Sequence, residues 1–220
     1  MSCIAALPDG TYLILNGAKV GVAGFGIASD PNHNALLYDP SKPINSRISI
    51  MANSTIDRFY HSEAILLQDG RVLVSGSDPE TDGLKQELRI EAFVPPYLKT
   101  GKAQPTFTIT DTDWTYGQTV TVSITLPGGG EPRFSLLGAD SSTHGNSMGQ
   151  RTIFPAFECT GNTCTITAPP NANVSPPGWH QLFLLDGPVP SRSTYVRIGG
   201  DPADLGSWPK LDDFSVPGSG

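Results

Sequence analysis

The sequence has 220 residues and a net charge of −7, and its 14 basic residues are scattered singly, which argues against nucleic acid as a partner. No apolar run approaches the length of a membrane span, so the sequence gives no reason to expect a membrane protein. The 24 Gly and 20 Pro residues, with only 16% charged residues, are typical of a turn-rich β protein.

The first half of the chain reads as a series of short strands. Apolar runs bounded by Gly, Pro, Asn and Asp recur there, and no segment of a dozen residues keeps a helical period. The runs predict strands at residues 11–15, 35–38, 63–67, 71–75 and 88–94.

An internal repeat lies in this half. Residues 7–15 match residues 67–75, and each copy has an Asp-Gly turn, then a buried strand, then a glycine, Gly17 or Gly76. A repeated unit of several short strands favours β-propeller blades of the kelch type. Two blades cannot close a propeller, so we expect exposed strand edges and faces.

The pattern changes after a predicted linker at residues 95–105. About seven short strands with turn signals between them fit an immunoglobulin-like sandwich, without the Cys–Trp–Cys arrangement of antibody domains. They are expected at residues 106–110, 118–126, 132–137, 151–157, 163–168, 179–186 and 193–198. The sequence therefore predicts an all-β chain with propeller blades over 1–98, a sandwich over 99–200 and a loosely ordered tail over 201–220.

The three cysteines bear on the compartment of the protein. Cys159 and Cys164 flank a turn-like Thr-Gly-Asn-Thr segment, so a disulfide across it is geometrically reasonable, with two unpaired thiols as the alternative. Cys3 is left over. Asn53 and Asn173 each begin a glycosylation sequon.

Two polar segments stand out as candidates for chemistry, residues 58–62 and residues 142–151. They contain Tyr60 and His61 in the first and His144 in the second. Two neutral imidazoles and a tyrosine oxygen form a plausible tetragonal site for Cu(II). Nothing in the spacing shows that the two segments meet, and the alternative without a metal site is a packed Tyr-His pair with a surface histidine. We expect His33 to lie exposed in a turn and His180 to be structural.

Several segments together resemble the glyoxal oxidase and galactose oxidase type of copper radical oxidase. They recur in that family's order across residues 6–198, and as a set they are highly specific. The segments are residues 9–18, 22–26, 36–40, 60–77, 91–98, 142–144, 148–151 and 176–179.

The resemblance implies a copper site. By position, Tyr60 is similar to the family's axial tyrosine ligand, His61 to one equatorial histidine, and His144 to the second histidine, delivered on a loop of the sandwich domain. The implied cofactor is copper paired with a tyrosyl radical. The implied reaction oxidises an aldehyde or a primary alcohol and reduces dioxygen to hydrogen peroxide.

The sequence departs from the family at the radical residue. In the family this is a tyrosine cross-linked to a cysteine on an earlier blade, and no segment here matches it. We therefore expect the chain to be the C-terminal part of such an oxidase, inactive alone and with weak or no copper binding by itself. Residues 1–8 have no basic region and no long apolar stretch, so we do not expect them to be a signal peptide. The resemblance and the expected disulfide nevertheless favour secretion.

Two other hypotheses remain open. One is a non-catalytic secreted module that acts through its surfaces, with the missing blades or a second copy as its partner. The other is a copper-binding or copper-delivering protein that uses the same three residues.

Overall fold

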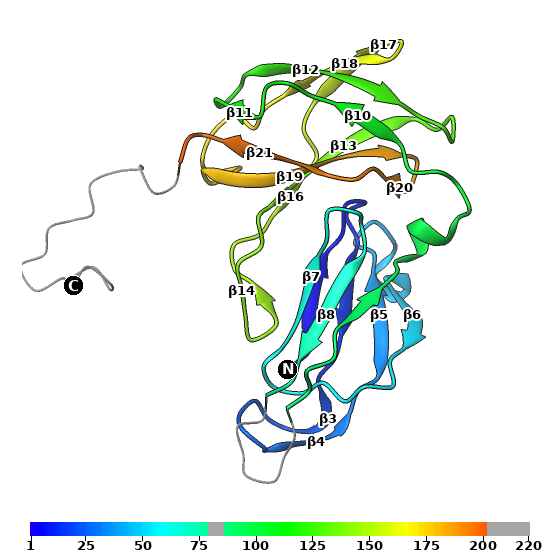
Figure 1. Ribbon diagram of the computed structural model, residues 1–220, viewed down its shortest axis with the longest axis vertical. Helices are drawn as coiled ribbons and strands as arrows, with labels where there is room; N and C mark the ends of the chain where they lie inside the picture. The colour runs from blue at the N-terminus through cyan, green and yellow to red at the C-terminus, as the bar shows by residue number, and fades with distance from the viewer. Residues whose placement is uncertain (79–85, 202–220) are drawn as a thin grey trace, which may run out of the picture.

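The computed structural model describes residues 1–78 and 86–201, and within them the chain is all-β, as the sequence predicted. Figure 1 shows two groups of strands, with β1–β9 in one half and β10–β21 in the other. The expected tail over 201–220 lies, except for Asp201, outside the described residues. No helix in the described part is long and apolar enough to cross a membrane.

The first half contains two antiparallel sheets that resemble propeller blades. One sheet has the order β1-β2-β5-β6, and the other has the order β7-β8-β9. Their strands are β1 (Cys3–Ala6), β2 (Tyr12–Leu15), β5 (Asn34–Tyr38), β6 (Ile48–Asn53), β7 (Ser62–Leu66), β8 (Val72–Gly76) and β9 (Glu91–Phe93). A separate hairpin, β3 (Ala18–Gly21) and β4 (Ala28–Pro31), extends from the first sheet.

The two copies of the sequence repeat adopt the same turn. In the first copy Gly10 N donates to Leu7 O at 3.0 Å, and in the second Gly70 N donates to Leu67 O at 3.0 Å. Gly10 (φ 93°) and Gly70 (φ 88°) both lie in the left-handed region that favours glycine. The repeat is therefore a structural unit as well as a sequence pattern.

The second half is a sandwich of two sheets. One has the order β10-β12-β18-β17 and the other β11-β21-β19-β13-β16, with β20 paired to β19. Their strands are β10 (Thr106–Thr108), β11 (Asp113–Trp114), β12 (Thr119–Thr125), β13 (Pro132–Gly138), β16 (Thr152–Ile153), β17 (Phe157–Thr160), β18 (Thr163–Thr167), β19 (Gly178–Asp186), β20 (Val189–Pro190) and β21 (Thr194–Ile198). Buried residues of both sheets form one core around Trp114 and Phe134.

The alternation of residues along the strands explains this packing. In β12, Val120, Val122 and Ile124 are buried, while the threonines and serine between them are exposed. Because successive side chains of a strand point to opposite faces, such a segment covers a core on one side only.

The predicted disulfide is present. Cys159 on β17 lies directly opposite Cys164 on β18, and the two sulfurs are bonded. Cys3 is the free cysteine, and it is buried.

The two halves share a second core. Leu137 of β13 and Phe183 of β19 pack with buried residues of the blade-like sheets, including Leu7 and Leu13. The short segment η2 (Pro96–Lys99) lies between the halves, and its Tyr97 donates to Gly70 O at 2.6 Å. The sandwich is therefore docked onto the blades by apolar burial and by hydrogen bonds.

Some strands differ from the sequence expectation. The predicted strand at 151–157 contains the whole of β16 and the first residue of β17, with Pro155, which has no amide hydrogen for a sheet ladder, between them. The strands β1, β3, β4, β6, β11 and β20 were missed, as were two short strands at residues 142–143 and 146–147. In β6, Ile48 and Ile50 face solvent, contrary to the pattern of a half-buried strand.

A small hairpin extends from the sandwich toward the blades. It consists of β14 (Ser142–Thr143) and β15 (Asn146–Ser147), and it descends along β7 in Figure 1. This hairpin carries the candidate residue His144.

Candidate metal centre

Tyr60 and His61 lie in a tight turn that leads directly into β7. Within the turn Ser62 Oγ donates to Phe59 O at 2.8 Å, and His61 has φ 58°. A left-handed non-glycine residue costs about 1–3 kcal/mol and persists only where its surroundings enforce it. Here the facing residue is Gly76, at which a Cβ would lie 2.5 Å from His61 O. The absence of a side chain at Gly76 therefore allows the His61 turn.

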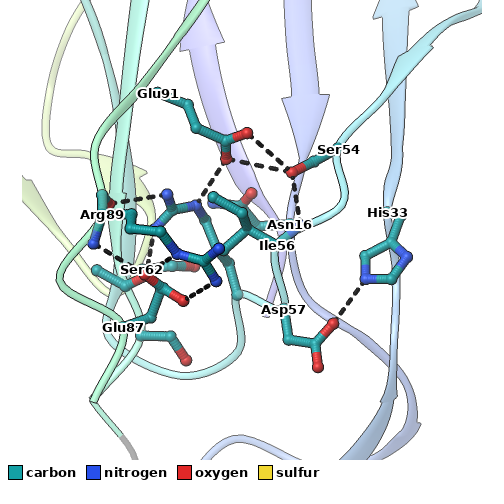
Figure 2. Close-up of polar contacts among 12 residues, drawn as sticks. Asn16, His33, Ser54, Ile56, Asp57, Ser62, Glu87, Arg89 and Glu91 are labelled. Carbon is teal, nitrogen blue, oxygen red and sulfur yellow. Dashed lines mark hydrogen bonds and ion pairs between the residues drawn. The ribbon is translucent and has the colours of Figure 1, made fainter. Parts of the chain in front are cut away.

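A buried arginine next to this turn holds its backbone in place. The side chain of Arg58 is 1% exposed and donates to Gly76 O at 2.7 Å, to Arg89 O at 2.9 Å and to the carboxylate of Glu91 at 3.2 Å. The carboxylate of Glu91 also accepts from Ser54, as Figure 2 shows. Because a buried guanidinium needs acceptors for its donors, this network fixes the backbone that begins at Arg58.

His144 occupies the turn of the β14–β15 hairpin. Thr143 pairs with Asn146, so the loop consists of the two residues His144 and Gly145, with φ 57° and 76°. Two-residue hairpin loops with positive φ at both positions are the favoured type I′ form, which usually places glycine second. The hairpin therefore projects the imidazole of His144 away from the sandwich.

The three predicted residues meet at this point. Nε2 of His144 lies 3.1 Å from the hydroxyl oxygen of Tyr60. The ring of Tyr60 stacks on that of His61 with centroids 4.0 Å apart, and the two histidine rings are 5.7 Å apart. A cavity of about 230 Å³ is lined by all three side chains, together with Met1, Ala23, Phe59, Ser62 and Asn146.

The surroundings of the three rings are partly apolar and partly polar. Phe25, from the β3–β4 connection, contacts Tyr60 and His61 edge-on at 5.3 and 5.4 Å between centroids. Thr143 Oγ1 lies 2.7 Å from Nδ1 of His144. When Nδ1–H donates to this hydroxyl, Nε2 carries the lone pair and faces Tyr60, which is the form that binds a metal.

The donor set is small. Within residues 1–78 and 86–201 there is no group of three or more His, Cys, Asp or Glu side chains that could hold a metal ion. Two imidazoles and one phenol oxygen nevertheless suit Cu(II), which accepts nitrogen and oxygen ligands in a tetragonal arrangement. The residues present therefore fit copper as a cofactor.

The other histidines lie elsewhere. His180 is buried, with Nε2 2.9 Å from Ser175 Oγ and Nδ1 3.0 Å from Gly178 O. The side chain of His33, expected to be exposed, is 37% exposed, and its Nε2 lies 2.7 Å from a carboxylate oxygen of Asp57 (Figure 2).

Sequence reasoning missed the residues that support the site. Phe25, Arg58, Thr143 and Glu63 all contact a candidate ligand or the turn that carries it. Arg58 and Thr143 lie in the polar segments that the sequence singled out, and Phe25 and Glu63 lie in segments that resemble the family, but nothing in the sequence assigns a role to any of the four. Their roles depend on contacts between distant parts of the chain.

Two family descriptions match the chain. Glyoxal oxidase N-terminus matches residues 1–97, and galactose oxidase-like, Early set domain matches residues 104–198. Together they cover the blade-like half and the sandwich.

Curated relatives match nearly the whole chain. A WSC domain-containing protein of Arthroderma benhamiae is 61% identical over 218 residues, which is 99% of this chain and 24% of the relative. The aldehyde oxidase GLOX of Vitis pseudoreticulata is 38% identical over 213 residues, which is 90% of this chain and 41% of the relative. The chain thus spans less than half the length of either relative.

A solved structure shares the fold. It is described as a novel fungal alcohol oxidase of the AA5 family in complex with copper, and it matches with a TM-score of 0.79 and 21% identity. The match covers 90% of this chain and 42% of that chain.

Proposed function

Because the chain belongs to the glyoxal oxidase and galactose oxidase-like family of copper radical oxidases, we propose that Tyr60, His61 and His144 are copper ligands. The single observation that carries this proposal is the convergence of the three side chains on one cavity, from segments about 80 residues apart. Copper, when bound, would supply one-electron redox chemistry at this place.

Other features of the chain preorganise the three proposed ligands. Both histidines are held in the strained left-handed conformation, which the fold retains although each costs about 1–3 kcal/mol. The hydroxyl of Thr143 orients the ring of His144, and Phe25 shields one side of Tyr60 and His61. Preorganised ligands lose less conformational freedom when they bind a metal.

We further propose that this chain alone does not oxidise an aldehyde or alcohol. The family's radical tyrosine is cross-linked to a cysteine, and none of the three cysteines of this sequence lies in a segment that resembles that one. Cys159 and Cys164 are bonded to each other. The buried thiol of Cys3 lies 3.1 Å from Ser62 O, and burial raises its pKa, so that it stays a protonated donor.

The proposed location is outside the cell. The Cys159–Cys164 disulfide persists in an oxidising compartment. The two sequon residues Asn53 and Asn173 are exposed, and we propose both as glycosylation sites, which mass spectrometry of the secreted chain would test.

A second role as a non-catalytic interaction module is favoured by one surface. Ile44, Ile48 and Ile50, along η1 (Ile44–Ser46) and the edge strand β6, are 78%, 59% and 77% exposed. An apolar edge strand is prone to pair with another chain. Self-association that depends on concentration, seen by sedimentation and reduced by Ile50→Lys, would support this role.

Calorimetric copper titration tests the main proposal. Because the fourth ligand of the family is absent, we expect weak binding of one copper per wild-type chain. Binding should be weaker still in His61→Ala and His144→Ala, with His33→Ala as a matched control that behaves as wild type. No hydrogen peroxide should form with methylglyoxal. Equal binding in all four proteins would refute the copper assignment, and peroxide production would refute the proposed inactivity.

A further inference from the structure

The side chain of Glu63 on β7 faces the β14–β15 hairpin and accepts two hydrogen bonds from it. Ser142 Oγ donates to Oε2 at 2.5 Å, and Gly145 N donates to Oε1 at 3.1 Å. These donors lie 79 and 82 residues from Glu63 in the sequence. One carboxylate therefore joins a strand of the blade-like half to the hairpin of the sandwich.

The two donors lie on either side of His144. Ser142 precedes it by two residues, and Gly145 follows it directly. An ionised carboxylate has two acceptor oxygens and can satisfy both donors at once, which neither an amide nor a hydroxyl side chain could do in the same way. The hairpin is thus held on both sides of the residue that carries the imidazole.

Strand β1 holds the same loop from another direction. Ile4 N donates to Gly145 O at 3.1 Å, so the amide and the carbonyl of Gly145 are both bonded to the blade-like half. A Cβ at Gly145 would lie 3.1 Å from both Cα and Sγ of Cys3. The loop therefore has little freedom to slide along β1.

Glu63 also lies two residues after His61, on the strand that the His61 turn leads into. The turn that positions His61 and the carboxylate that holds the hairpin of His144 therefore lie on the same short backbone segment. We propose that Glu63 is a positioning residue of the candidate metal centre, which sets the imidazole of His144 against Tyr60 and His61. The functional meaning of this inference rests on the proposed copper site, whereas the hydrogen bonds of Glu63 to the hairpin do not depend on that proposal.

The first experiment uses the metal-free chain. Hydrogen exchange of the Gly145 amide, followed by NMR, should be at least about 10-fold faster in Glu63→Ala than in wild type, because its acceptor is lost. Glu63→Gln, which keeps the shape of the side chain, should give an intermediate rate. Glu131→Ala removes an exposed carboxylate from the sandwich and should leave the rate unchanged.

The second experiment measures copper affinity. Loss of an orienting partner of a metal-ligating histidine weakens binding about 10- to 100-fold, and we expect this range for Glu63→Ala. In a His144→Ala background, Glu63→Ala should cause little further loss, because the ligand that it positions is absent. Ser142→Ala removes one of the two bonds and keeps the charge, so it should weaken binding by less.

The outcomes separate the two proposals. If the wild type binds no copper but the Gly145 amide is protected through Glu63, the copper assignment fails and the positioning contact stands. If the wild type binds copper and Glu63→Ala changes neither amide exchange nor affinity, the positioning role is wrong. It is equally wrong if Glu63→Ala weakens copper while Ser142→Ala and the exchange rate stay at wild-type values, since the carboxylate then acts by charge alone.

Discussion

Nε2 of His144 and the hydroxyl oxygen of Tyr60 lie 3.1 Å apart, although 84 residues separate them in the chain. One belongs to a hairpin of the sandwich, and the other to the turn before a blade strand. Their contact depends on the packing of the two halves through a common core and on the hydrogen bonds of the hairpin to Glu63 and Ile4. The candidate site should therefore respond to changes in the contacts between the halves as well as to changes in its own side chains.

Gly145→Ala should displace the hairpin. The new methyl group would lie 3.1 Å from Cys3 Sγ and Ser2 O, and φ of 76° is unfavourable for alanine. We expect weaker copper binding, comparable to that of His144→Ala, in a calorimetric titration.

Gly149→Ala is the matched control for that change. Gly149 has φ 71°, so the backbone strain is similar, but nothing lies within 4 Å of its Cβ position. Equal loss of copper affinity in both alanine variants would show that strain alone, and not the contact with Cys3, is responsible.

Arg58→Met should destabilise the whole fold. The change leaves Gly76 O and Arg89 O without their donors and the Glu91 carboxylate without its cation. Breaking such a buried network costs about 3–5 kcal/mol, which urea unfolding would measure. A loss below 1 kcal/mol would mean that water replaces the guanidinium, contrary to its burial here.

Tyr97→Phe should cost about 1 kcal/mol of unfolding free energy. The phenol donates to Gly70 O at 2.6 Å, and burial raises the pKa of Tyr97 well above its usual value, so the hydroxyl remains a donor. The ring would still fill its place between the halves. If Tyr97→Phe has the same thermal unfolding temperature as the wild type, this hydrogen bond does not contribute to stability.

Stability should fall as the pH decreases below about 6.5, partly because of His180. Burial lowers the pKa of this imidazole and outweighs the hydrogen bond to Gly178 O, which raises it. Between about pH 6.5 and the lower pKa that His180 has in the folded state, the unfolded chain binds a proton that the folded chain does not. This difference destabilises the fold.

Urea unfolding at pH 7.5 and pH 5.5 measures this contribution. His180→Gln should lose less stability on acidification than the wild type does, because it has no imidazole to protonate. Identical losses in the two proteins would exclude His180 as a cause.

The sequence predicted the fold class and most strands because their signals are local. The alternation of Val120, Val122 and Ile124 with polar residues, and the Asp-Gly turns before β2 and β8, are readable within a few residues. Strand β6 was missed because its isoleucines face solvent, so the alternation does not mark a core.

The site could be predicted in part. Tyr60, His61 and His144 were identified through family resemblance, and their convergence required the docking of the sandwich hairpin. Glu63 could not be foreseen, because its partners Ser142 and Gly145 are brought to it only by the tertiary fold.

Electron paramagnetic resonance of the copper-loaded chain tests the central claim most directly. If Tyr60, His61 and His144 bind the metal, the wild type should show one tetragonal Cu(II) signal with couplings to two imidazole nitrogens. In His144→Ala one of these couplings should disappear, while His33→Ala should keep both. A signal that is identical in His144→Ala and the wild type, or that matches free copper in buffer, would contradict the claim.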